Sequence, residues 1–109
     1  MILKKSLKQN MQIKLDKKFE TNFNLILEFI AKDKLSASKK FKKDLFEQIK
    51  NIPNFPFKFR KSIYFDNIAL RDMTFKGYTI TYEIDSHKNQ IIILNIFNKN
   101  KPWLSYFIL

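Results

Sequence analysis

The sequence predicts an α+β fold, in which an antiparallel pair of helices packs on one face of a twisted, mostly antiparallel sheet. Apolar residues recur at helical spacing through residues 16–52 and alternate at strand spacing from residue 68 onward. The chain has 109 residues, 45% of them hydrophobic, which suffices for one domain with one core. Because the helices come first and most strands later, the class is α+β rather than alternating α/β.

The chain is expected to begin its fold with a strand and a helix. Met11–Leu15 alternates between apolar and polar residues, which predicts a half-buried strand that joins the sheet from far away in sequence. Asp16 is a suitable N-cap for the helix that follows, which extends through Ala31. The apolar positions of this helix are Phe19, Phe23, Ile26, Leu27 and Ile30.

A second helix follows after a short connection, about Lys32 to Ala37. Ser36 or Ser38 is expected to be its N-cap, and Pro53 to end it. Its apolar positions are Phe41, Leu45, Ile49 and Ile52. The short connection makes the two helices antiparallel neighbours, and the lysines at positions 39, 40, 42 and 43 are expected on the solvated face of the second helix.

The second half of the chain predicts a loop and three strands. Asn54–Phe59 contains two turn-forming residues and three Phe within a few positions, which favours an ordered loop packed on the core. The predicted strands are Ile68–Met73, Tyr78–Ile84 and Ile91–Phe97, and the polar residues between the last two close a hairpin. The alternation also places the rings of Tyr78 and Tyr82 in the core, with satisfied hydroxyl groups.

The composition limits the kinds of function that the chain can have. The 21 Lys and Arg against 10 Asp and Glu give a net charge of +11, which predicts an acidic partner, either nucleic acid or an acidic protein. No Cys and a single His predict neither disulfides nor a metal site, and one Gly excludes the glycine-rich phosphate loops of nucleotide-binding enzymes. No apolar run is long enough to span a membrane. We therefore expect a cytoplasmic protein without cofactors.

Several short strings carry a family resemblance. They are Leu70-Arg71, Gly77-Tyr78-Thr79-Ile80, Tyr82-Glu83-Ile84-Asp85 and Ile92-Ile93-Leu94-Asn95-Ile96-Phe97, which follow one strand, two helices and a Pro turn. In this order the chain resembles the RelE/ParE superfamily of bacterial toxins over residues 11–102. The resemblance implies a small toxin fold and a type II toxin–antitoxin pair, in which an antitoxin from the same operon neutralises the toxin.

The superfamily contains two kinds of activity, and one residue bears on the choice. Members that cleave mRNA on the ribosome often carry an Arg just after the Gly-Tyr pair, where it stabilises the negative charge of the transition state. Here that position is Thr79, whose neutral hydroxyl cannot make a charge-assisted contact with phosphate. If the chain were such a ribonuclease, its candidate catalytic groups would be Arg71, Lys99 and Lys101, without an evident general base.

The other kind, the ParE-like members, has no ribonuclease site and inhibits DNA gyrase through protein contacts. Leu35–Phe41 resembles the Ser-Ala element that begins the second helix of these proteins, and Ile52–Pro56 resembles the turn that follows. We therefore predict a ParE-like toxin that binds gyrase and a cognate antitoxin. A ribosome-dependent mRNA endoribonuclease and a non-toxic relative that only binds its partner are the alternatives.

Basic side chains near aromatic ones are the candidate binding residues for the target or the antitoxin. They are Lys58, Arg60, Lys61, Arg71, Lys99, Lys101 and Trp103. For Arg71 an ion pair with Asp72 or Glu83 is the preferred interpretation, and contact with a partner is the alternative. His87 lies in a polar turn and is expected to be exposed rather than catalytic.

The two ends of the chain lie outside the resemblance. Residues 1–10 precede a second methionine, Met11, and are expected to be a disordered N-terminal extension before the toxin domain of residues 11–102. Residues 103–109 are almost entirely apolar. Such a tail must be covered by the helical pair, by a second copy of the chain in a homodimer, or by the antitoxin.

Overall fold

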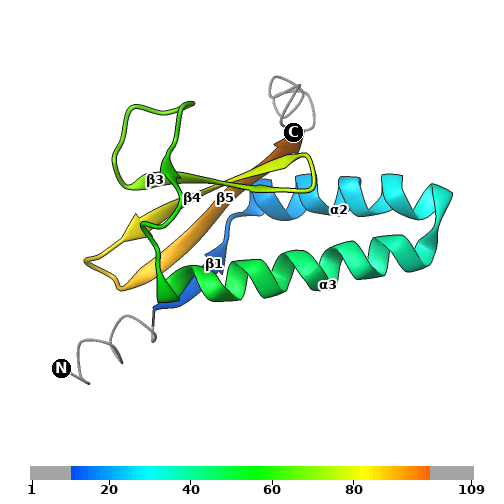
Figure 1. Cartoon of the computed structure of the whole chain (residues 1–109), viewed down its shortest axis with the longest axis horizontal. Helices are drawn as coiled ribbons and strands as arrows, with labels where there is room; N and C mark the ends of the chain where they lie inside the picture. Colours follow the sequence, from blue (N-terminus) through cyan, green and yellow to red (C-terminus); the bar gives the residue numbers. More distant parts are fainter. Residues whose placement is uncertain (1–10, 99–109) are drawn as a thin grey trace.

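The computed structural model of the chain describes residues 11–98. The predicted extension at residues 1–10 and the apolar tail at residues 103–109 lie outside the described residues. The elements, in chain order, are β1 (Gln12–Leu15), α2 (Lys17–Asp33), α3 (Leu35–Asn51), the short 3-10 helix η1 (Ile52–Asn54), β2 (Arg60–Lys61), β3 (Leu70–Phe75), β4 (Tyr78–Asp85) and β5 (Gln90–Asn98). Figure 1 shows these elements as one helical layer beside one sheet, which confirms the predicted α+β class.

The sheet has the strand order β1-β5-β4-β3-β2. Strands β3, β4 and β5 are antiparallel neighbours, as predicted. Strand β1 joins them from far away in sequence, but it pairs with β5 in parallel, from Gln12 opposite Gln90 to Leu15 opposite Ile93. The sheet is therefore mixed.

The strands differ from the prediction in one boundary and in one additional strand. Strand β3 begins at Leu70 rather than Ile68, because the backbone N–H of Leu70 closes a turn by donating to the carbonyl of Asn67 at 3.0 Å. Strand β2 was not predicted, since the adjacent cations Arg60 and Lys61 show no apolar alternation. These two residues pair with β3.

The two helices are connected more tightly than the sequence predicts. Helix α2 begins where expected, with the carboxylate of Asp16 accepting from the N–H of Lys18 at 3.0 Å. The expected N-caps Ser36 and Ser38 are wrong, because a single extended residue, Lys34, separates α2 from α3. Ser38 lies inside α3, where its buried hydroxyl donates to the carbonyl of Leu27 at 2.8 Å and ties the helices together.

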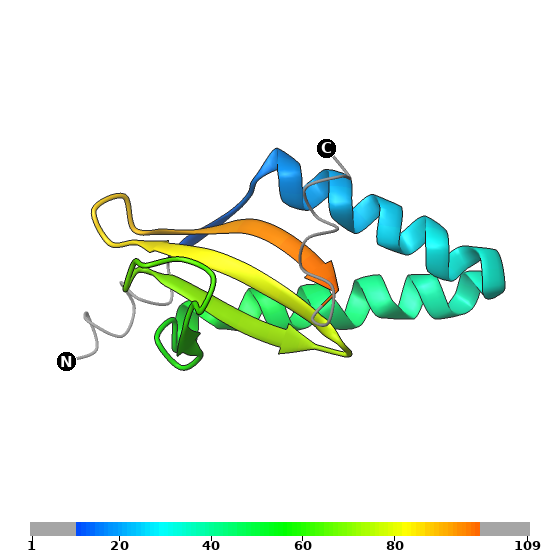
Figure 2. The same cartoon turned by 90° about the horizontal axis from the view of Figure 1, so that it is seen from above.

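The core lies between the helical pair and one face of the sheet (Figure 2). The ring of Phe23 lies 5.4 Å from that of Phe19 and 5.4 Å from that of Phe46, while Phe41 of α3 meets Tyr78 of β4 at 5.5 Å. Strand alternation then puts Ile80, Tyr82 and Ile84 on the same face as Tyr78. The fully buried residues of this core include Phe19, Leu45, Ile49, Ile80, Tyr82, Ile91 and Ile93.

The helical pair is longer than the sheet that it covers. Its connecting turn projects beyond the ends of the strands in both views (Figures 1 and 2). The large side chains near that turn consequently lack a sheet to pack against. Phe29 is 70% exposed and Leu35 is 59% exposed.

Tyr82 confirms its predicted place in the core. Its ring is fully buried, and its hydroxyl donates to the carbonyl of Pro56 at 2.6 Å, which fastens the segment after η1 to the sheet. Replacing Tyr82 with Phe removes the hydroxyl group and leaves the carbonyl of Pro56 without this hydrogen bond. We expect the free energy of unfolding, measured by chemical denaturation, to fall by about 1 kcal/mol.

The same side chain predicts a pH dependence. Burial raises the pKa of Tyr82 well above its ordinary value. Above about pH 10 the phenol therefore ionises in the unfolded chain while it stays protonated in the folded one, so stability falls as the pH rises. Tyr82→Phe should lose less stability than the natural chain over this alkaline range. Parallel curves for the two proteins would contradict the assignment.

Candidate functional site

The position after the Gly-Tyr pair is buried within the sheet. Thr79 of β4 lies opposite Thr74 of β3 and Phe97 of β5, and its side chain has no exposed area. Its hydroxyl oxygen has no hydrogen-bond partner among residues 11–98. The structure thus gives this position neither a charge nor access to solvent.

Arg71 holds a loop in place instead of pairing with a carboxylate. Its Nε donates to the carbonyl of Ile68 at 3.1 Å, and its Nη1 donates to the carbonyl of Phe59 at 3.2 Å. The guanidinium also lies 4.9 Å from the centre of the Phe57 ring. The predicted ion pair with Asp72 or Glu83 is wrong, since adjacent strand residues point to opposite faces of a sheet. Asp72 is adjacent to Arg71 itself, and Glu83 is adjacent to Tyr82, the cross-strand partner of Arg71. Arg71 thereby joins the two ends of the segment between residues 57 and 68.

Asp72 anchors the same loop from the opposite face of the sheet. Its side chain is fully buried and accepts from the hydroxyl of Thr81 at 3.0 Å and from the N–H of Ile63 at 3.2 Å. Arg60 Nη2 lies 3.8 Å from the same carboxylate, so the ion pair that Asp72 makes is with Arg60. Nearby, the ring of Tyr64 packs edge-on against Phe97 at 5.1 Å. These contacts fold residues 62–69 over the sheet face that the helices leave uncovered.

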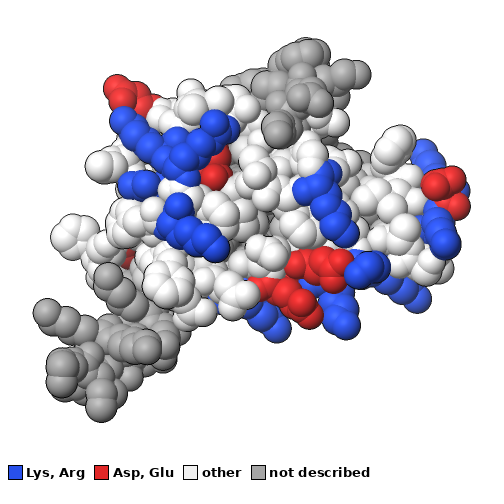
Figure 3. Space-filling view, viewed as in Figure 1, with Lys and Arg blue, Asp and Glu red and all other residues white. Residues whose placement is uncertain are grey.

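This loop and the turn before β2 together carry the largest group of exposed apolar side chains in the described part of the chain. Each of these side chains is between 48% and 70% exposed; they are Phe55, Phe57, Ile63, Phe65 and Ile68. Four cations accompany them, Lys58, Arg60, Lys61 and Arg71. Figure 3 shows Lys and Arg side chains gathered over this part of the molecule. We call the nine side chains together the loop surface.

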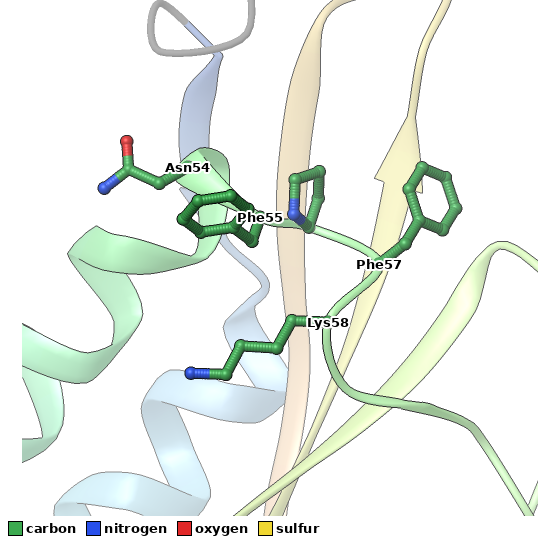
Figure 4. Close-up of a pocket in the computed structure, with 5 residues that line it drawn as sticks. Asn54, Phe55, Phe57 and Lys58 are labelled. Atoms are coloured by element: carbon green, nitrogen blue, oxygen red, sulfur yellow. The ribbon is translucent and has the colours of Figure 1, made fainter.

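The first part of the loop surface is hollowed. A hollow of about 520 Å³ is lined by Asn54, Phe55, Pro56, Phe57 and Lys58. The rings of Phe55 and Phe57 point in different directions there, and the amino group of Lys58 points away from Phe57 (Figure 4). That amino group lies 5.5 Å from the centre of the Phe59 ring. The arrangement offers apolar walls beside a cation, which suits an amphipathic side chain of a partner.

The structure brings together four of the seven predicted binding residues. All four belong to the loop surface, where Lys58, Arg60 and Lys61 are exposed and Arg71 is half-buried. The other three, Lys99, Lys101 and Trp103, lie outside the described residues, as do two of the three candidate ribonuclease groups. His87 is exposed in the turn between β4 and β5, as predicted.

Sequence reasoning missed the apolar half of the loop surface. The segment Asn54–Phe59 was expected to pack on the core, but only Pro56 and Phe59 turn inward, while Phe55 and Phe57 are mostly exposed. The sequence pattern held no signal for this, because residues 55–58 form a turn in which the N–H of Lys58 donates to the carbonyl of Phe55 at 3.0 Å. The two-residue period of a strand, which would place Phe55, Phe57 and Phe59 on one side, does not apply to a turn.

The part of the chain that the structure describes has neither a cluster of metal ligands nor a membrane-spanning helix. Within residues 11–98 no three His, Asp or Glu side chains lie close enough to hold a metal ion. Neither helix of that range combines the length and the apolar character that crossing a bilayer requires.

The fold and the comparisons define the class of protein. The fold is a helical pair packed on one face of a mixed five-stranded sheet. The family described as "ParE toxin of type II toxin-antitoxin system, parDE" matches residues 13–103, and the chain belongs to that family.

A solved structure shares the fold. The "Chromosomal ParDE TA system from P. aeruginosa" aligns with a TM-score of 0.67 at 18% sequence identity, covering 83% of this chain and 97% of that chain. Among curated proteins no sequence matches the chain significantly.

The role of Arg71 in fastening the loop predicts the effect of a conservative substitution. Arg71→Lys keeps the charge, but one ammonium group cannot reproduce the planar fork that reaches both carbonyls. We expect a loss of about 1–2 kcal/mol in the free energy of unfolding. Amide exchange of residues 57–68 should also become faster.

The matched control is Arg60→Lys, because the Arg60 side chain is 52% exposed and makes only the longer contact with Asp72. Its effect on both measurements should be small. Equal effects of the two substitutions would contradict the special role of Arg71.

Proposed function

We propose that this chain is a ParE-like toxin that inhibits DNA gyrase by binding it, without catalysis, and that a cognate antitoxin neutralises it. Membership of the ParE toxin family supports the toxin assignment. The observation that carries the rest is Thr79, a buried neutral side chain at the position where mRNA-cleaving relatives often have a cation.

The chemistry of RNA cleavage supports the same conclusion. Cleavage needs a cation free to approach the phosphate and a group that activates the attacking hydroxyl. The guanidinium of Arg71 is occupied by two backbone carbonyls and an aromatic ring. A binding mechanism makes no such demand, because it needs only a surface with charge and exposed apolar area.

The proposed antitoxin contact is an acidic or amphipathic segment that wraps the helical pair and the sheet. Leu25, Phe29 and Leu35 are exposed apolar side chains on the helices, which also carry many exposed lysines. A disordered acidic segment that folds on binding could cover both kinds of surface.

The proposal is tested by two assays with the purified full-length chain. We expect it to reduce the supercoiling activity of gyrase in a dose-dependent way and to leave mRNA intact in a translation reaction. The protein encoded beside it, added in equimolar amount, should restore supercoiling. Cleavage of mRNA at translating ribosomes, together with undiminished supercoiling, would contradict the proposal.

The second candidate function, a ribosome-dependent endoribonuclease, is favoured by the net charge of +11, which suits an RNA-rich target. Its candidate groups Lys99 and Lys101 can be removed together as Lys99→Ala with Lys101→Ala. Under the gyrase proposal the toxicity of the expressed chain should persist in the double variant. Loss of toxicity together with loss of mRNA cleavage would instead favour the ribonuclease.

A further inference from the structure

We infer that the loop surface is the docking site for an acidic protein segment that also carries apolar side chains, supplied by the protein that this toxin inhibits. The inference rests on the proposed function and names the part of the chain that performs it. The observations that carry it are the make-up of the loop surface and the way in which the sheet holds it.

The loop surface is held in shape before any partner binds. Arg71 fixes the carbonyls of Phe59 and Ile68 on one face of the sheet, and Asp72 fixes the N–H of Ile63 on the other. The hydroxyl of Tyr82 fastens Pro56 at 2.6 Å. A loop that is already ordered loses little conformational entropy on binding, so its exposed side chains can contribute most of their contact energy.

The apolar side chains on this loop have no structural reason to be exposed. Pro56, Phe59 and Tyr64 already supply the contacts that pack the loop on the sheet. Phe65 and Ile68 add no contact of this kind and remain 48% and 69% exposed. Burying these two side chains against a partner removes apolar surface from water, which favours binding.

The charges select an acidic partner. The loop surface carries four cations, and the nearest carboxylates are those of Asp66 and Asp72. Lys61 pairs with Asp66 at 3.7 Å, but Asp66 is fully exposed, so this contact is weak and a partner carboxylate can replace it. Lys58 lines the hollow together with the exposed rings of Phe55 and Phe57, which matches a segment where Asp or Glu alternates with apolar residues.

The same features favour protein over single-stranded nucleic acid. Nucleic acid is held by aromatic faces that stack with bases and by cations along its backbone. On the loop surface Ile63 and Ile68 are aliphatic and cannot stack, and one face of Phe57 is already covered by Arg71.

The test is a binding titration with the full-length chain. The probe is a fluorescein-labelled peptide of alternating Glu and Phe, followed by fluorescence anisotropy at about 0.15 M salt, where long-range attraction is screened. We expect binding that weakens by about tenfold or more in Phe65→Ser with Ile68→Ser, and likewise in Arg60→Ser with Lys61→Ser. Circular dichroism and a denaturation curve check that each variant is folded.

Two lysines at the other edge of the sheet, away from both the loop surface and the helical pair, provide the control. Lys14→Ser with Lys88→Ser removes the same charge as Arg60→Ser with Lys61→Ser, since both lysines are exposed. This pair should weaken peptide binding by no more than about twofold. An equal loss in the control pair, or tighter binding of an oligouridylate of the same length than of the peptide, would overturn the inference.

The source of the segment is decided by two further measurements on the Phe65→Ser, Ile68→Ser variant. If the target supplies the segment, the concentration needed to inhibit gyrase rises by about tenfold while the affinity for the antitoxin is unchanged. The reverse pattern would overturn the assignment to the target. If the natural chain does not inhibit gyrase, the proposed function fails, whereas the peptide titration still decides whether the loop surface is a docking site.

Discussion

The structure depends on one mismatch: a sheet has two faces, but the described chain has one helical layer to cover them. The pair formed by α2 and α3 buries the face that carries Ile80 and Tyr82. The opposite face carries Thr79, Thr81 and Phe97, which are also buried. The loop between β2 and β3 covers part of this face, and it stays there because β3 holds it. The sheet is therefore covered by the helical pair on one face and, in part, by the loop on the other face.

The alternation of side chains along β3 explains how one strand holds a loop on both sides. Arg71 and Asp72 are neighbours in sequence, so they necessarily point to opposite faces. Each makes hydrogen bonds to backbone groups of the loop, and neither is paired with the other. Ordering by backbone contacts leaves the loop's own side chains free to face outward. The exposed Phe and Ile side chains of the loop surface are therefore not needed to hold the loop on the sheet. They are available to contact a partner.

The sequence predicts the elements well because the periodic pattern reports which face of an element is buried. The spacing of Phe19 and Phe23 was sufficient to predict the buried face of α2. The alternation from Tyr78 to Ile84 was sufficient to predict the buried face of β4. Periodicity does not report the partner of a strand, so the parallel pairing of β1 with β5 could not be predicted. The cations of the loop surface were predicted to be binding residues only because they are basic and lie near aromatic residues in the sequence. The role of Arg71 was missed because its acceptors are backbone carbonyls, which leave no trace in a sequence, and an adjacent carboxylate suggested an ion pair instead.

The parallel pairing of β1 with β5 has a consequence for biosynthesis. Strand β1 is translated first among the described elements, but its partner is translated last. The helices have only local contacts to make and can form early, whereas closure of the sheet must await a contact of very long sequence separation. On the ribosome a nascent chain therefore presents the apolar stripe of α2 and α3 before the strands that will cover it exist. Chaperones that recognise exposed apolar helices would meet this chain during that interval.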